Sequence, residues 1–290
     1  MTERFEQLGL TISDQLDNAV FTAHNAHNQL FYWVDHPKGK ALIAAYGAHI
    51  ISYHPTSQPE QLWLSHTSEL NGKAAIRGGI PLCWPWFGNA KSPNHGYARI
   101  NQWTLDQIST NEERTEITLK LDHRMIEQSE FEFKLECKFT VAEKLTVELT
   151  TYNQDKHPIS ISSALHSYLA TDRDSVKLSG MGNSYQDKAQ DFKLCKQAIF
   201  ELSEQTDRIY TSPQSELELT HGNGRKLHFT HQGEDAVVVW NPGDQLASTI
   251  ADIHPGGASE YLCVEVAKTL TPANIAPGEH YCLKQEITPS

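Results

Sequence analysis

Phe131-Glu132-Phe133-Lys134-Leu135-Glu136-Cys137-Lys138-Phe139 is the stretch that decides the fold class of this 290-residue chain. Apolar and charged side chains alternate along it, which is the period-two pattern of an antiparallel strand with one buried face and one wet face. The same alternation recurs in residues 117–121 and 145–149. Because the three stretches follow one another closely, they predict a meander of antiparallel strands.

The rest of the chain extends this pattern. Continuous apolar runs at residues 236–240 and 261–267 predict strands that are covered on both faces. Turn sequences recur, for example Asn71-Gly72 and Asn241-Pro242-Gly243, whereas helical signals are scarce and residues 186–206 show no clear pattern. We therefore expect an all-β fold, a large sandwich of antiparallel sheets with few short helices. No linker or repeat divides the chain, so we expect residues 1–290 to form one domain.

The composition limits the classes of molecule that the protein could bind. The chain carries 36 acidic and 24 basic side chains and a net charge of −12, so nucleic acid and anionic membranes would repel it. An anionic small molecule would need a local cluster of Arg or Lys. Five cysteines without a CxxC motif favour a reduced, cytoplasmic location, and we find neither a signal peptide nor a membrane-spanning run. The sequence is silent on oligomeric state, and a monomer is our working expectation.

An aromatic loop is predicted at residues 77–88, Arg-Gly-Gly-Ile-Pro-Leu-Cys-Trp-Pro-Trp-Phe-Gly. Its two prolines and three glycines exclude a helix. Three large aromatic side chains within four residues either stack on a sugar ring or fill the core of the protein, and composition leaves both open. Trp86 is our candidate for contact with a sugar.

Two arginines flank that loop. Arg77 opens it, and His95 and Arg99 follow shortly after in Asn-His-Gly-Tyr-Ala-Arg. A guanidinium group matches the oxygens of a phosphate, so the two arginines form a candidate phosphate grip. The alternative is that both pair with carboxylates of this acidic protein.

Two further stretches contain candidates for proton transfer. His166 lies in Ser-Ser-Ala-Leu-His-Ser-Tyr-Leu and is either a hydrogen-bonded core histidine or a proton donor that acts near neutral pH. Glu265 is the only charged residue in the apolar run 261–267. Burial raises the pKa of a carboxyl group, and such groups concentrate at functional sites. Glu265 is therefore either a catalytic base or a member of a structural ion pair.

The remaining signals are weaker. Asp207 accompanies a short predicted strand at residues 206–210, where a turn is a more ordinary explanation than a site. His24 and His27 have HxxH spacing, but no third ligand is evident nearby, and a surface turn is expected. We find no phosphate-binding or nucleotide-binding glycine motif and no GxSxG motif. We therefore expect neither a metal nor a cofactor.

The motifs taken together resemble a known family. IRGGIPLCWPWFG, HGYAR, SSALHSYL, TDRIY, VVVWNP and YLCVEVA occur in the order found in the D-hexose-6-phosphate mutarotases, the glucose-6-phosphate 1-epimerases of the aldose 1-epimerase superfamily. The resemblance runs from about residue 30 to the end of the chain. It implies a galactose-mutarotase-like β-supersandwich and an isomerase that interconverts the α and β anomers of a hexose 6-phosphate without a cofactor.

The resemblance also implies roles by position. His166 and Glu265 resemble the catalytic histidine and glutamate of the family, and Arg77 and Arg99 the residues that hold the phosphate. His95 and Asp207 resemble ligands of the sugar hydroxyls. Residues 1–30 and 211–235 match nothing in the family that we can place.

Two rival functions stay open. A non-catalytic sugar-phosphate sensor could use the same fold, although a sensor needs neither a proton donor nor a base. A glycoside hydrolase or lyase would need two carboxylates across the scissile bond, and Glu265 with Asp207 or Asp252 could supply them. Fold likeness alone does not decide between these functions.

Overall fold

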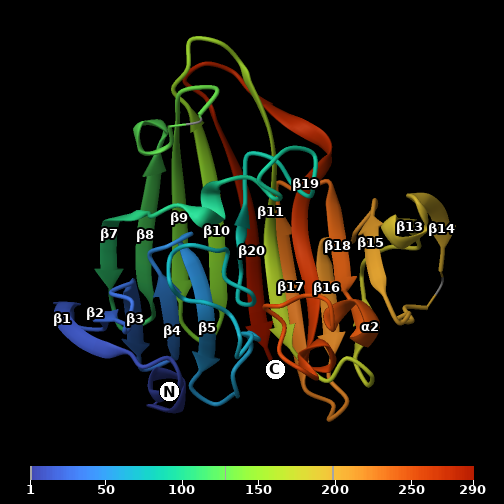
Figure 1. Cartoon of the computed structure of the whole chain (residues 1–290), viewed down its shortest axis with the longest axis horizontal. Coiled ribbons are helices and arrows are strands. Elements are labelled where there is room, and N and C mark those ends of the chain that lie inside the picture. The colour runs from blue at the N-terminus through green and yellow to red at the C-terminus, as the bar shows by residue number, and fades with distance from the viewer. Residues whose placement is uncertain (1, 128, 198) are drawn as a thin grey trace.

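Three antiparallel sheets make up most of the structure, a computed structural model that describes residues 2–127, 129–197 and 199–290 (Figure 1). The five-stranded sheet has the order β1-β2-β3-β4-β5 and consists of β1 (Thr11–Asp17), β2 (Val20–His24), β3 (Leu30–His36), β4 (Gly39–Ala44) and β5 (His49–Pro55). In Figure 1 the blue strands of this sheet lie at one end of the molecule and the β13–β14 hairpin lies at the other.

The two large sheets contain the other strands. The eight-stranded sheet, ordered β12-β16-β17-β20-β10-β9-β8-β7, consists of β7 (Thr104–Thr110), β8 (Thr115–Asp122), β9 (Phe133–Val141), β10 (Leu145–Asn153), β12 (Lys177–Ser179), β16 (Glu216–Thr220), β17 (Lys226–Gln232) and β20 (His280–Pro289). The seven-stranded sheet, ordered β14-β13-β15-β18-β19-β11-β6, consists of β6 (Leu82–Cys83), β11 (Ile159–Ala170), β13 (Ser184–Asp187), β14 (Lys193–Lys196), β15 (Thr206–Tyr210), β18 (Ala236–Asn241) and β19 (Tyr261–Ile275).

Helices are few and short in the described residues, as the sequence predicts. The α-helices are α1 (Thr2–Gln7) and α2 (Gly243–Ala247), and the 3₁₀ turns are η1 (Ala98–Ile100), η2 (His123–Met125), η3 (Lys188–Gln190) and η4 (Gly257–Glu260). The unassigned stretch 186–206 folds as the end of β13, η3, β14 and the start of β15. In residues 2–127, 129–197 and 199–290, no helix has the length and apolar character needed to span a bilayer.

The predicted meander is confirmed as β8, β9 and β10. Phe139 on β9 pairs with Ile117 on β8 and with Val147 on β10, and all three side chains are buried. The predicted start of the middle strand at Phe131 was wrong. The strand begins at Phe133, and Phe131 lies half-buried in the preceding turn. The alternating faces then hold the sheet in a single register, since a one-residue slip would expose the whole apolar set.

One core lies between the large sheets. Leu165 on β11 and Val264 on β19 belong to the same buried cluster as Phe229 on β17 and Leu283 on β20. Strands β18 and β19 are buried on both faces over residues 236–239 and 261–267, which confirms the interpretation of their continuous apolar runs. The second face of these strands is therefore packed as well, and that face contains the candidate site.

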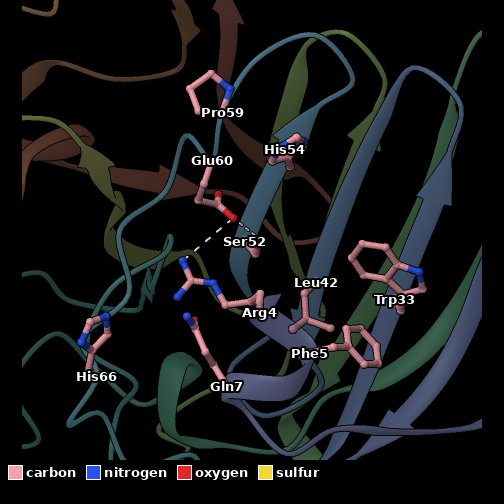
Figure 2. A pocket seen from close by; sticks show the side chains of 10 residues that line it. All are labelled: Arg4, Phe5, Gln7, Trp33, Leu42, Ser52, His54, Pro59, Glu60 and His66. Atoms are coloured by element: carbon pink, nitrogen blue, oxygen red, sulfur yellow. Dashed lines mark hydrogen bonds and ion pairs between the residues drawn. The ribbon is translucent and has the colours of Figure 1, made fainter. Parts of the chain in front are cut away.

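Helix α1 lies on the five-stranded sheet and leaves a pocket beside it (Figure 2). Phe5 meets the Trp33 ring edge-on at 5.4 Å, and the pocket has a volume of about 380 Å³. Its acidic residue, Glu60, accepts hydrogen bonds from the backbone N–H groups of Tyr53 and Leu62 and lies 4.0 Å from Arg4. These contacts give Glu60 a structural role in joining α1 to β5. The pocket contains none of the candidate residues from the sequence.

The β9 register gives a stability prediction. Phe139→Ala should lower the free energy of unfolding by about 3–5 kcal/mol, because a fully buried aromatic ring would be replaced by a cavity. The neighbouring Thr140→Ala, on the opposite face of the same strand, should cost less than about 1 kcal/mol. Urea unfolding of the two variants and the unmutated protein measures both changes. Similar losses for the two variants would contradict the assigned faces.

Candidate active site

His166 and Glu265 lie directly opposite each other on the paired strands β11 and β19. The imidazole Nε2 is 3.3 Å from the carboxylate Oε1, and the two side chains are only 8% and 1% exposed. Both residues lie on the face of the seven-stranded sheet that points away from the main core. The other face carries Leu165, Val264 and Val266, which pack into that core.

The aromatic loop is hydrogen-bonded to the edge of β11 opposite to β19. The backbone N–H of His166 donates to the carbonyl of Pro81 at 3.1 Å, and that of Tyr168 donates to the carbonyl of Gly79 at 2.9 Å. Gly79 has a φ of +60°, and a Cβ there would lie 2.2 Å from the carbonyl oxygen of Ile50. Only glycine therefore allows the loop to run this close to β5 and β11. The backbone at His166 is thus held between two neighbouring segments of the protein, the loop on one side and β19 on the other.

His95 is brought to the same place by a second close approach. Gly96 has a φ of +72°, and a Cβ there would lie 2.0 Å from the carbonyl oxygen of Trp84. The His95 ring then meets the His166 ring edge-on, with centroids 5.6 Å apart, and its Nδ1 accepts a hydrogen bond from the backbone of Gly88. The structure thus brings His95 next to the candidate acid–base pair.

The two arginines have different partners. Arg77 donates from Nε to the Asp252 carboxylate at 3.1 Å and from a terminal nitrogen to the Tyr168 hydroxyl at 2.9 Å. Carboxylate pairing, one of the two interpretations of the sequence, therefore holds for Arg77. Arg99 donates to the carbonyl of Asn94 at 2.9 Å, and its buried Nε has no hydrogen-bond partner among the described residues. Arg99 is the arginine that has a free donor.

Asp207 reaches the site from β15, where it pairs with Trp240 on β18. Its carboxylate forms an ion pair with Lys188 at 3.1 Å. Sequence reasoning missed Lys188, because it lies in the unassigned stretch 186–206, where no motif marks it. The structure thus adds a third cation to the region of Arg77 and Arg99.

The three aromatic side chains of the loop lie in three different environments. Trp84 is fully buried and donates from its indole nitrogen to Thr151, so it fills the core. Trp86 donates to the carbonyl of Pro93 and packs edge-on against Tyr97. Phe87 is the one in ring contact with His95, at 5.2 Å. Neither of the Trp86 contacts is with the site, and Trp86 stays a prediction as the sugar contact, while Phe87 is the aromatic of the loop that lies beside His95.

Burial shifts the pKa values of the two candidate proton-transfer groups in opposite directions. It lowers the pKa of His166 well below its usual value, and the nearby His95, Arg99 and Arg77 lower it further. It raises the pKa of Glu265 well above its usual value, and the neighbouring Asp207 adds to that rise, while Lys188 and Arg99 oppose it. Both shifts favour the neutral pair, in which the two groups share one ionisable proton.

Burial also shifts the pKa values of His95 and Asp207. Burial, helped by Arg99, Lys188 and Arg77, lowers the pKa of His95 to about 3, so this ring is neutral at pH 7. Burial raises the pKa of Asp207, and Lys188 partly offsets the rise. Three cations, Arg77, Arg99 and Lys188, act on the pair or on His95 beside it. The local cluster that an anionic ligand would need in this acidic chain is present.

Each member of the pair also has an unused atom. His166 Nδ1 and Glu265 Oε2 are buried and make no hydrogen bond to any described residue. Leaving a buried polar atom unpaired costs about 1–3 kcal/mol, so such atoms call for an explanation by function or by a ligand. Each of the two groups therefore keeps one atom available to give or take a proton.

The structure also bears on metal ligands. Three buried side chains each offer one potential ligand atom, and these atoms lie within 4.8 Å of one another: His166, Cys263 and Glu265. The HxxH pair is different: His24 ends β2 and bonds to Ser13, while His27 is exposed in a turn, which confirms the expected surface turn.

Comparison with known proteins gives a consistent result. The family model described as "Aldose 1-epimerase" matches residues 31–288. A Salmonella typhimurium protein named "Putative glucose-6-phosphate 1-epimerase" is 33% identical over 264 residues, which cover 88% of each chain. An Escherichia coli K12 protein of the same name is 34% identical over 244 residues, which cover 81% of each chain.

A solved structure agrees with the fold. The crystal structure described as that of a "putative mutarotase" from Salmonella typhimurium superposes with a TM-score of 0.93 at 29% identity, and the match covers 100% of this chain and 98% of that one. The predicted β-supersandwich of large antiparallel sheets is thereby confirmed.

The depressed pKa of His166 can be measured directly. We expect its imidazole in the free protein to stay neutral until well below pH 6.5, because burial and the nearby arginines disfavour the charged ring. Long-range ¹⁵N–¹H correlation spectra recorded against pH report this, with the His166→Gln spectrum identifying the resonance. A titration midpoint at or above 6.5 would contradict the described electrostatics.

Proposed function

The chain belongs to the aldose 1-epimerase family and is an isomerase, and from that premise we propose that it interconverts the α and β anomers of a hexose 6-phosphate, with glucose 6-phosphate as the first candidate. One observation carries the proposal. The buried His166–Glu265 pair has an unpartnered Nδ1 and an unpartnered Oε2, and it lies within reach of the cations Arg77, Arg99 and Lys188. The pair fits proton transfer, and the charge fits a phosphate.

The proposed reaction needs two proton transfers at one sugar. Glu265 takes the proton of the C1 hydroxyl while His166 gives a proton to the ring oxygen. The C1–O5 bond then breaks to give the open-chain aldehyde, which turns about C1–C2. Reclosure on the other face of the carbonyl reverses both transfers and gives the second anomer. Each positioned proton-transfer group contributes typically ~10²–10⁴-fold to the rate.

The direction of the pKa shifts supports these roles. A carboxyl group with a raised pKa is a stronger base, and an imidazole with a lowered pKa is a stronger acid. Both shifts therefore act toward Glu265 as the base and His166 as the acid. A phosphate dianion would favour the imidazolium form that donates to the ring oxygen.

The phosphate is assigned to the cationic side of the site. Arg99 has a buried nitrogen donor without a partner, and Lys188 and Arg77 add to the positive charge. Arg77 must share its donors with Asp252, so we expect its contribution to be smaller than that of Arg99. His95 and Asp207, which lie beside the pair, are proposed ligands of the sugar hydroxyls, and Phe87 is the proposed apolar wall.

The ion pairs weigh against a glycoside hydrolase. Such an enzyme needs a second carboxylate to act opposite Glu265. Asp252 is bound to Arg77 and Asp207 to Lys188, whereas the partner of Glu265 is an imidazole. A carboxylate–imidazole pair suits ring opening better. A non-catalytic sensor would keep the same site and is distinguished by the variants below.

Two variants test the acid–base assignment. His166→Ala and Glu265→Gln should each lower the anomerisation rate of glucose 6-phosphate by at least about a hundredfold, because one of the two proton transfers is lost. Binding should persist, since neither residue is assigned to the phosphate. A coupled assay that consumes a single anomer gives the rate, and calorimetry gives the affinity. Near-normal rates in either variant would refute its role, and an inactive unmutated protein that still binds would favour the sensor.

The arginines are tested by comparing two sugars. Arg99→Ala should weaken glucose 6-phosphate binding about tenfold to a hundredfold, since a charge-assisted contact is worth about 1.5–3 kcal/mol. Arg77→Ala should have a smaller effect in the same direction. The rate with glucose, which has no phosphate, should hardly change. Arg124→Ala serves as the control, because Arg124 is 78% exposed and bonds to Asp122. Equal losses with both sugars would make the arginines structural.

A further inference from the structure

Cys263 has no part in the proposed reaction, yet it faces the acid–base pair. Cys263 and Glu265 alternate along β19 and therefore point to the same face, and His166 is the residue directly across from Glu265. All three side chains are more than nine-tenths buried. The strands that carry them are central in their sheet and hydrogen-bonded on both sides, so the three side chains start from fixed positions.

From this cluster we propose that the protein binds one zinc-like divalent cation through Cys263, His166 and Glu265, and that the bound ion inhibits the acid–base pair. The ligand set is one sulfur, one imidazole nitrogen and one carboxylate oxygen, which are the three donor types that Zn²⁺ takes in proteins. The inference rests on geometry and does not depend on which sugar the protein uses.

The geometry requires only a small adjustment. In a tetrahedral zinc site with bonds of about 2.0–2.3 Å, neighbouring ligand atoms lie roughly 3.3–3.7 Å apart. His166 Nε2 and Glu265 Oε1 are already 3.3 Å apart, and no separation within the trio exceeds 4.8 Å. A side-chain rotation of Cys263 that moves its sulfur by about 1 Å closes the site. Water would take the fourth position.

The charges also balance. Binding releases the proton of the Cys263 thiol and the proton that the pair shares, and both go to solvent. The resulting thiolate and carboxylate neutralise the two charges of the ion, so that no net charge is buried. Asp207 favours a cation at this place, and Lys188, Arg99 and Arg77 oppose it. The opposing cations limit the site to ions that form strong bonds to sulfur, and exclude Mg²⁺ and Ca²⁺.

An ion held in this way occupies the two groups that are proposed to move protons. Zinc should therefore inhibit anomerisation in competition with the sugar, and a chelator should restore the rate. This is the reverse of a metal-dependent enzyme, in which a chelator removes activity. The thiol at Cys263 would make the site sensitive to zinc without taking part in the reaction.

Cobalt titration of the reduced protein tests the site without reference to activity. Co²⁺ is a spectroscopic substitute for Zn²⁺, and a thiolate ligand gives a charge-transfer band in the near ultraviolet. We expect one equivalent per chain to produce this band, and Zn²⁺ to abolish it. Cys263→Ser should remove the band and weaken Zn²⁺ binding at least tenfold. Cys195→Ser, which alters a half-buried thiol outside the cluster, should leave the band unchanged.

Several outcomes would overturn the proposal. Absence of the band in the unmutated protein would do so, and so would a band that survives in Cys263→Ser. In the activity assay, the unliganded Cys263→Ser variant should keep its rate within about twofold and need at least tenfold more Zn²⁺ for half-inhibition. Inhibition equal to that of the unmutated protein would place zinc elsewhere. Failure of the sugar-phosphate assignment would leave the cobalt result intact, so the two proposals fail separately.

Discussion

The burial of His166 and Glu265, paired across β11 and β19, is the constraint on which the candidate site depends. It requires two neighbouring strands that are covered on both faces, because a single wet face would solvate the carboxyl group and return its pKa to the usual range. The eight-stranded sheet supplies one cover through the shared core, with Ser167 donating to Gln285 across the two layers. The 77–88 loop supplies a neighbour at the edge of β11, and its glycines allow that approach.

Burial gives this pair its chemistry and also makes it costly. A buried acid–base pair contributes little to stability, because the loss of hydration offsets the attraction between its members. The large apolar core around it makes that cost tolerable. The same loss of hydration lowers the pKa of His166 and raises that of Glu265, and three cations in an otherwise acidic chain make the surroundings suitable for an anion. Fold and function thus share one physical cause, the exclusion of water from this face of the sheet.

Much of this was accessible from the sequence. The alternation in residues 131–139 predicts β9 and its neighbours, and the lone charge in residues 261–267 identifies Glu265 as unusual. The sequence could not show that Arg77 is bound to Asp252, because 175 positions separate them and only the folded chain brings them together. Lys188 lies in a polar stretch without periodicity. Trp86 stays a prediction as the sugar contact, and the sequence could not show that Phe87 is the loop aromatic beside His95, because an irregular loop has no repeating direction from which side-chain orientation can be derived.

The central claim is that this buried pair moves protons on a sugar phosphate. Two-dimensional exchange NMR between the α and β anomers of glucose 6-phosphate measures it at equilibrium, without a coupling enzyme or an added reagent. The account predicts that magnetisation transfer between the two C1 signals rises in proportion to the protein added and saturates with substrate. It should fall to the uncatalysed rate when Glu265→Gln protein is added instead. A transfer rate that the unmutated protein leaves unchanged would contradict the account.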